Sequence, residues 1–189
     1  MDSRHQTMSK PTRFSDMVDF RTPMYLWAYI DSRFNVEYDG ACQEGVNNLA
    51  KPLRLEDNWP DGVIYSNPPF DTDSIIKWAI KGYEHSRKND KNVHLLLIPD
   101  KLNHVKIQRE CCHTFDKIIF FGGRIDFPSP YAVKGGASRN GSILIVQSMN
   151  IDRNNEYILL SEIKQSMITT DPPYEIIKPK PSNESLVWV

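Results

Sequence analysis

The stretch at residues 63–70 constrains the fold of this chain more than any other. Residues 63–66 (Val-Ile-Tyr-Ser) are apolar and β-prone, which predicts a buried strand, and Asn-Pro-Pro-Phe follows directly at 67–70. Two successive prolines fix their φ angles at about −65° and donate no backbone hydrogen bond, so the strand has to end here. A helix capped near Asp71 is predicted next, with its apolar face at Ile75, Ile76, Ala79, Ile80 and Tyr83.

Strand and helix patterns alternate through the rest of the chain. Thr22 and Pro23 predict a helix start, as N-cap and first helical residue, and this helix would extend to about Asp31. Further helical patterns occur at 43–51 and 103–113, and strand patterns occur at 34–38, 53–55, 94–98, 117–121 and 142–147. This alternation predicts the α/β class, with an open, mostly parallel sheet and flanking helices.

Three polar residues follow or close predicted strands, namely Asp39, Asp57 and Asn67. In open α/β sheets, ligands bind beyond the carboxyl ends of the strands, so these residues mark the predicted site. For Asp39 the alternative is a turn residue at a strand end. For Asp57, a cofactor contact and a purely structural role are both open.

The four residues at 67–70 also suggest a chemistry. The prolines hold the Asn67 side-chain oxygen and the Pro68 carbonyl toward the same small space, which suits a planar exocyclic amine. Such an amine could donate one hydrogen to each oxygen while the Phe70 ring stacks on its heterocycle. With both hydrogens engaged, the nitrogen lone pair leaves conjugation and becomes nucleophilic. An ordinary Pro-Pro turn is the alternative.

The chain length and the composition predict one catalytic domain. With 189 residues and 40% hydrophobic content, the chain can bury one sizeable core, which we assign to 21–160. Residues 1–20 are polar and aperiodic and predict a flexible arm, and the polar, proline-rich residues 161–189 predict a tail. The net charge of −1 gives no global basic field, so a nucleic acid would have to be held by local patches.

The cysteines indicate the cellular compartment, and the histidines indicate whether a metal site is expected. An odd count of cysteines, at 42, 111 and 112, argues for a reducing compartment and predicts a cytoplasmic protein. No apolar run approaches the ~18 residues of a membrane span, so no membrane partner is expected. The five histidines lack metal-ligand spacing, which predicts no metal.

Several short motifs follow one another in a recognisable order. They are Thr22-Pro23, Asp39-Gly40-Ala41-Cys42, Asn67-Pro68-Pro69-Phe70, Trp78, Gly123-Arg124-Ile125-Asp126-Phe127 and Gly141-Ser142. In this order and spacing, residues 21–147 resemble the small phage-encoded DNA N6-adenine methyltransferases of the Dam-like family. The resemblance implies a Rossmann-like class I fold and a site-specific transfer of a methyl group from S-adenosyl-L-methionine to adenine N6 in DNA. If the chain is phage-encoded, it would act in the host cytoplasm.

The resemblance also implies roles for individual residues. Thr22 and Pro23 would cradle the methionine end of the cofactor, Asp39 would bind its amino group, and Asp57 would lie near its adenine. Ala41 and Asn67 complete the expected cofactor contacts. The target base would be held by Asn67, Pro68, Pro69 and Phe70.

One position departs from the family pattern. Asn67 stands where bacterial Dam enzymes carry Asp, and other amino-methyltransferases share this Asn. A methyltransferase acting on RNA or on protein glutamine is therefore an alternative, as is a non-catalytic relic that binds nucleic acid or cofactor.

DNA contacts are expected from two segments that combine basic and aromatic residues. One is the arm, with Arg4, Lys10 and Arg13, and the other is the long connection at 122–141. In the connection, the expected substrate contacts are Arg124, Tyr131, Lys134 and Arg139. A plain connection between strands is the alternative.

A second tetrapeptide, Asp171-Pro172-Pro173-Tyr174, is closer to the Dam-type pattern. Its context disfavours it, because Lys178-Pro179-Lys180-Pro181 follows and cannot form the helix that such a site needs. Trp78 is expected to pack in the core.

Overall fold

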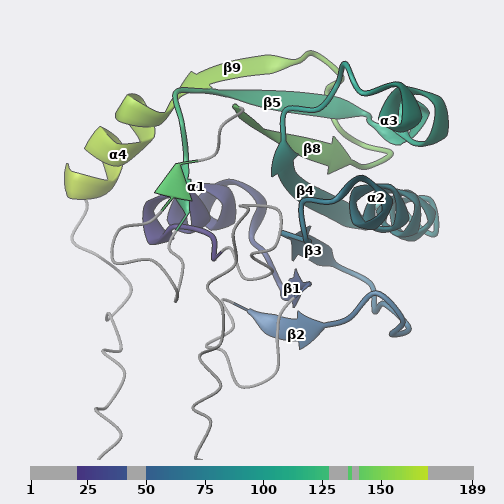
Figure 1. Ribbon diagram of the computed structural model, residues 1–189. Helices are drawn as coiled ribbons and strands as arrows, with labels where there is room; N and C mark the ends of the chain where they lie inside the picture. The colour runs from purple at the N-terminus through teal and green to yellow at the C-terminus, as the bar shows by residue number, and fades with distance from the viewer. Residues whose placement is uncertain (1–20, 42–49, 128–135, 138–140, 170–189) are drawn as a thin grey trace, which may run out of the picture.

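The computed structural model describes residues 21–41, 50–127, 136–137 and 141–169, and for 136–137 and 167–169 it describes the backbone alone. A seven-stranded sheet lies between two helical layers (Figure 1). Within the described chain, no helix combines the length and the apolar character needed to cross a membrane.

The sheet is mixed but mostly parallel. Its strand order is β2 (Lys51–Leu53), β1 (Tyr38–Gly40), β3 (Val63–Ser66), β4 (Val93–Pro99), β8 (Ser142–Gln147), β5 (Lys117–Gly122) and β9 (Glu156–Leu159). β8 pairs antiparallel with both β4 and β5, and the other pairs in this sheet are parallel. The order and the flanking helices confirm the predicted Rossmann-like α/β fold.

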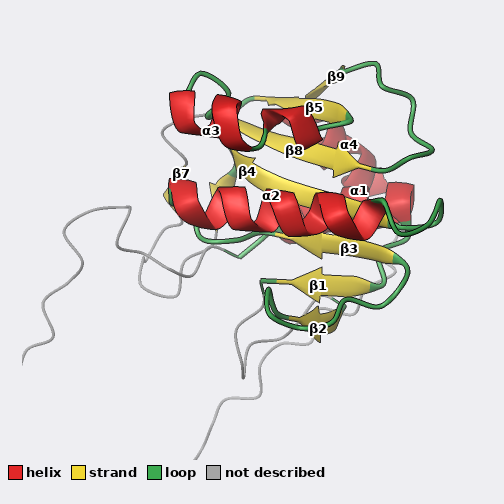
Figure 2. Cartoon of the chain, turned by 90° about the vertical axis from the view of Figure 1, so that its right-hand side faces the viewer, coloured by secondary structure: helices red, strands yellow, loops and turns green. Residues whose placement is uncertain are grey.

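Helices cover both faces of the sheet. On one face lie α1 (Met24–Phe34) and α4 (Leu160–Thr169), which share a core with Tyr65 and Leu144. On the other face lie α2 (Thr72–Ser86), seen across the sheet in Figure 2, and α3 (Val105–Glu110), followed by a 3₁₀ turn at Cys112–Thr114. A separate two-stranded ribbon pairs β6 (Asp126–Phe127) with β7 (Gly136–Ala137).

The central strands form where the sequence predicts them because they are apolar on both faces. β4 and β8 are buried along nearly their whole length, as expected for strands covered by helices on both sides. Helix α2 also begins as predicted, because the Asp71 side chain accepts a hydrogen bond from the Ser74 backbone N–H at 2.8 Å.

The buried face of α2 differs from the predicted one. Ile80 is 40% exposed, whereas Trp78 and Gly82 face the sheet together with Ile75 and Ala79. Gly82 allows this rotation, because a Cβ there would overlap the imidazole ring of His94 on β4. The expected packing of Trp78 is confirmed.

The first helix and strand are shifted from their predicted limits. Pro23 is the N-cap of α1, so Thr22 lies outside the helix and its hydroxyl turns to the sheet. The helix extends to Phe34 and ends at Asn35, which has a left-handed backbone (φ 53°) and donates its N–H to Asp31. The predicted strand at 34–38 is therefore observed at Tyr38–Gly40.

The other differences between predicted and observed elements occur where the sequence patterns are weakest. The strand predicted at 53–55 is β2 at Lys51–Leu53, so Lys51 belongs to a strand and not to the helix predicted at 43–51, most of which lies outside the described residues. We expected a tail from residue 161, whereas the structure continues through β9 into helix α4. Leu160 and Ile163 of α4 are 3% and 2% exposed, because they pack into the core beside α1.

Candidate active site

The carboxyl ends of three neighbouring strands meet at one edge of the sheet. Gly40 of β1 pairs with Ser66 of β3, and Ser66 pairs with Leu96 of β4. The residues that leave these strands, Ala41 and Asn67 among them, therefore emerge side by side. This is the edge at which open α/β sheets bind ligands.

The Asn67 side chain is oriented by a pair of hydroxyls. Tyr65 Oη and Thr22 Oγ1 are 2.5 Å apart, and Asn67 Nδ2 donates to Thr22 Oγ1 at 3.3 Å. Because the nitrogen and the oxygen of an amide lie on opposite sides of its carbon, this contact turns Asn67 Oδ1 away from Thr22. The Oδ1 atom is itself buried. Thr22 thus positions the first residue of the tetrapeptide.

Tyr65 is a fixed, neutral member of this group. Its ring is fully buried against Trp27 of α1, with the ring centroids 5.3 Å apart. Burial raises the pKa of the Tyr65 hydroxyl well above its ordinary value, and the nearby Asp39 carboxylate raises it further. Asp39 is the cross-strand partner of Tyr65, so both side chains lie on the α1 face of the sheet. The structure therefore brings Thr22, Asp39 and Asn67 together around Tyr65.

The chain leaves β1 through a tight and unusual turn. A Cβ at Gly40 would lie 2.5 Å from Ser66 Oγ and 2.9 Å from Trp78 Cζ3, so only glycine permits this approach. Ala41 follows with φ at 58°, a left-handed conformation that is uncommon for residues with a side chain. Such backbone conformations cluster at ligand sites, and the expected contact of Ala41 with the cofactor stays a prediction.

Phe70 closes the tetrapeptide and packs on a second aromatic ring. The centroids of the Phe70 and Phe127 rings are 5.4 Å apart at an interplanar angle of 71°, an edge-to-face contact. Phe127 is fully buried, whereas Phe70 is half-buried. The backbone carbonyl of Phe70 accepts a hydrogen bond from Lys101 Nζ at 2.6 Å. We did not predict either contact, since both depend on tertiary structure.

Asp57 lies in a turn of its own. Its Oδ2 accepts from the Arg54 backbone N–H at 2.7 Å, and its carbonyl accepts from Lys81 Nζ on α2 at 3.1 Å. These contacts stabilise the turn after β2. The expected contact of Asp57 with the cofactor stays a prediction.

The predicted DNA contacts are described only in part. Arg124 is exposed, between Gly123 at φ 111° and the buried Ile125. Outside the described residues lie Arg4, Lys10, Arg13, Tyr131, Lys134, Arg139 and the tetrapeptide at 171–174. Among the residues that the structure does describe, no cluster of histidine, cysteine or acidic side chains could hold a metal ion.

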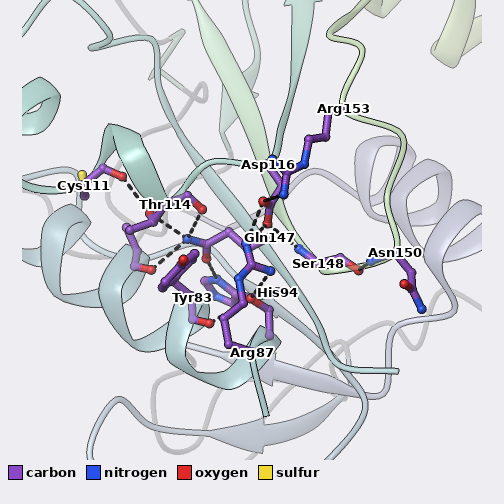
Figure 3. Close-up of polar contacts among 12 residues, drawn as sticks. Tyr83, Arg87, His94, Cys111, Thr114, Asp116, Gln147, Ser148, Asn150 and Arg153 are labelled. Carbon is purple, nitrogen blue, oxygen red and sulfur yellow. Dashed lines mark hydrogen bonds and ion pairs between the residues drawn. The ribbon is translucent and has the colours of Figure 1, made fainter. Parts of the chain in front are cut away.

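A buried polar network reaches Ser66, the residue before the tetrapeptide, and Figure 3 shows its part around Gln147 and His94. Gln147 Nε2 donates to the carbonyls of Ala79 and Thr114, which leaves its Oε1 to accept from His94 Nδ1 at 2.7 Å. His94 Nε2 must then accept from the Ser66 hydroxyl, 3.0 Å away. Burial lowers the pKa of His94 to about 4, so it is neutral at pH 7. The network anchors Ser66, the residue before Asn67.

The strand order, the single antiparallel strand and the site at the carboxyl edge define a Rossmann-like methyltransferase fold. The chain matches the family model of DNA N-6-adenine-methyltransferase (Dam) over residues 10–171. It therefore belongs to this family, which confirms the resemblance, and DNA adenine methylation by way of a methyl donor is its broad activity. No curated protein matches the chain.

Proposed function

We propose that this chain transfers a methyl group from S-adenosyl-L-methionine to N6 of adenine at chosen sites in DNA, with Asn67, Pro68, Pro69 and Phe70 as its catalytic residues. The observation that carries the proposal is the orientation of Asn67. Thr22 Oγ1 accepts a hydrogen bond from the amide nitrogen of Asn67, and the Tyr65 hydroxyl holds Thr22 in place. The buried Oδ1 of Asn67 is therefore oriented as a hydrogen-bond acceptor.

Asn67 Oδ1 and the Pro68 carbonyl would accept the two hydrogens of the adenine amine. Accepting both draws the nitrogen lone pair out of conjugation and makes it the attacking group. The nitrogen would take the methyl group as the bond from that methyl to the sulfonium sulfur breaks, with the electron pair staying on sulfur as the neutral thioether leaves. The nitrogen becomes cationic and loses one proton to solvent afterwards, so no base has to remove a proton beforehand. The contribution of the protein is alignment of a polarised amine.

Phe70 would hold the plane of the target base. An adenine in a duplex has to be flipped out of the stack, which costs a few kcal/mol and is offset by new stacking and hydrogen bonds. The half-buried Phe70 ring offers a stacking surface, and Phe127 supports it from behind. Further DNA contacts are expected from Arg124, from Tyr131, Lys134 and Arg139, and from the basic arm.

The residues at the end of β1 suit the methyl donor. When bound, S-adenosyl-L-methionine supplies a methyl group on a sulfonium sulfur. Asp39 would bind its amino group, and the left-handed turn at Ala41 bends the backbone sharply where β1 ends. Thr22 and Pro23 would lie against its methionine end, since Thr22 already contacts Asn67.

Incubation with methyl-labelled S-adenosyl-L-methionine and separate DNA, RNA and protein pools tests the proposal. Label should appear in DNA, as N6-methyladenine after digestion to nucleosides, and mapping should show preferred sequences. Label confined to RNA or to protein would overturn the substrate assignment.

The cofactor assignment has its own test. Asp39→Ala should weaken binding of S-adenosyl-L-methionine in calorimetry by about tenfold, the loss of one good polar contact. Equal affinity in the wild type and in Asp39→Ala would remove Asp39 from the site.

A further inference from the structure

The junction between the tetrapeptide and α2 is held by a side chain from another part of the chain. Lys101 Nζ donates to the Phe70 carbonyl at 2.6 Å, in a part-buried position. A hydrogen bond from an ammonium group is shorter and stronger than one between neutral groups. The accepting carbonyl lies between the Phe70 ring and Asp71, the N-cap of α2.

The backbone around Lys101 is itself fixed. Asp100, the first residue after β4, donates its N–H to the Gly141 carbonyl at 2.8 Å, where β8 begins. The Lys101 carbonyl accepts from the His104 N–H at 2.9 Å, which closes a turn. The ammonium group is therefore presented from a rigid loop at the carboxyl edge of the sheet.

The tetrapeptide needs such an external attachment. Pro68 and Pro69 have no backbone N–H, so neither can anchor the loop by donating a hydrogen bond. The contact with Phe127 holds the Phe70 ring, and the bond from Lys101 holds the Phe70 peptide group. Together they determine both the position and the tilt of the ring that would stack on the target base.

We propose that Lys101 is a positioning residue for methyl transfer, acting through the Phe70 carbonyl. The inference rests on the proposed function of the tetrapeptide. A misplacement of about 1 Å at a catalytic group can cost ~100-fold in rate, so losing this bond should slow the methyl-transfer step while leaving binding intact.

A matched control lies nearby in the sequence, on helix α3. Lys106 Nζ forms an ion pair with Asp73 on the first turn of α2 at 2.6 Å, so it ties α3 to α2. The Lys106 and Asp73 side chains are 42% and 67% exposed, and Lys106 has no contact with the tetrapeptide backbone among the bonds described. Replacing it removes the same charge without touching Phe70.

The test compares Lys101→Met, Lys101→Arg and Lys106→Met in the full chain. Single-turnover methyl transfer to DNA should fall about 10- to 100-fold in Lys101→Met and stay near the wild-type rate in Lys106→Met. Lys101→Arg should recover most of the rate, because a guanidinium can still donate to the carbonyl. Affinities for DNA and for S-adenosyl-L-methionine should change by less than about twofold in all three.

Three results would overturn the proposal. A fall in DNA affinity with a shallower salt slope, at an unchanged single-turnover rate, would make Lys101 a phosphate contact. Loss of the cooperative thermal transition in Lys101→Met would make it a structural residue. An unchanged rate in Lys101→Met, measured beside an active wild type, would leave it without a role. Failure of the proposed function is a different outcome, since the wild type itself would then not methylate DNA.

Discussion

The two edges of the sheet are built differently. At the amino edge, where the parallel strands begin, side chains bind backbone groups of neighbouring segments. Asn92 Oδ1 accepts from the Gly62 N–H at 3.0 Å, and Asn155 Oδ1 accepts from the Ile118 N–H at 3.0 Å. Asp116 accepts from the Ser148 N–H at 2.9 Å and binds Arg87 through both carboxylate oxygens, as Figure 3 shows.

Positive φ angles occur at both edges, at Asn35 and Gly62 on the amino side and at Ala41 and Gly123 on the carboxyl side. The carboxyl edge differs in its side chains. The Ser142 hydroxyl, where β8 starts, is buried with no hydrogen-bond partner among the described residues. Asn67 is held by Thr22, and Phe70 is held by Lys101 and Phe127, all of which come from other segments. The comparison teaches that the amino edge stabilises the fold, whereas the carboxyl edge is shaped for ligands. Substitutions at the two edges should therefore affect different measurements.

The largest effect is expected from Asn67→Ala at the carboxyl edge. Removing a hydrogen-bonding group that acts on developing charge typically costs about 100- to 1,000-fold in rate, so single-turnover methyl transfer should fall by that order. Its melting temperature should change little, because the hydrogen bond from Asn67 to Thr22 is long, at 3.3 Å. Asn67→Asp keeps an acceptor oxygen and should be more active than Asn67→Ala. A normal rate in Asn67→Ala would place catalysis elsewhere.

Ile163→Ala in α4 should affect stability alone. The side chain is 2% exposed, and truncating a buried isoleucine costs about 2–5 kcal/mol of unfolding free energy. Gln165→Ala, on the exposed side of the same helix, should change it by less than ~0.5 kcal/mol. Denaturant unfolding measures both.

Two truncations extend this test to the second tetrapeptide. Ending the chain after residue 160 removes Ile163 and should abolish cooperative unfolding. Ending it after residue 169 keeps α4 and should leave a folded, active enzyme without residues 171–174. If the second truncation folds and binds cofactor but does not methylate DNA, part of the active site lies at 171–174.

The stability should fall with acidification because of His94. The fold lowers the pKa of this imidazole from 6.5 to about 4. Between these values the unfolded chain binds a proton that the folded chain does not, so the free energy of unfolding should decrease by up to about 3 kcal/mol as the pH falls from 6.5 to 4. Burial lowers the pKa of His85 as well, which acts in the same direction. His94→Gln should show a shallower pH dependence in this window.

The smallest effects are expected from the arginines of the amino edge. Arg87 contacts both oxygens of Asp116, whose side chain is 6% exposed, so Arg87→Met should cost about 1–2 kcal/mol in unfolding free energy. Arg153 reaches the same carboxylate at 3.4 Å but is 73% exposed, and Arg153→Met should cost less than ~0.5 kcal/mol. Methyl transfer by both variants should be normal. A slowed rate in Arg87→Met would mean that the two edges are coupled.

The sequence predicted those parts of the fold that depend on local patterns. β3, β4 and β8 are apolar runs, and α2 has a capping aspartate, so each appeared within a few residues of its predicted position. The neighbourhood of Asn67 also followed, because parallel strands present their carboxyl ends at one edge.

The features that we missed depend on distant segments. β9 alternates half-buried and exposed residues, and Tyr157 is 80% exposed, so its pattern resembles a loop. Thr22 has the chemistry of a helix cap, yet its hydroxyl binds Tyr65, which lies 43 positions away. Lys101, in the loop after β4, and Phe127, on β6, both contact Phe70, and neither contact leaves a pattern in the sequence.

The position of β8 has a consequence for the way the chain is made. This strand lies between β4 and β5 in the middle of the sheet, although it comes after both in the sequence. During synthesis the inner edges of β4 and β5 remain unpaired until residues 142–147 leave the ribosome, and unpaired apolar edges promote aggregation. Long-range pairing of this kind also slows folding. The centre of the sheet is therefore completed only once β8 has been synthesised, and until then the edges of β4 and β5 are exposed to aggregation.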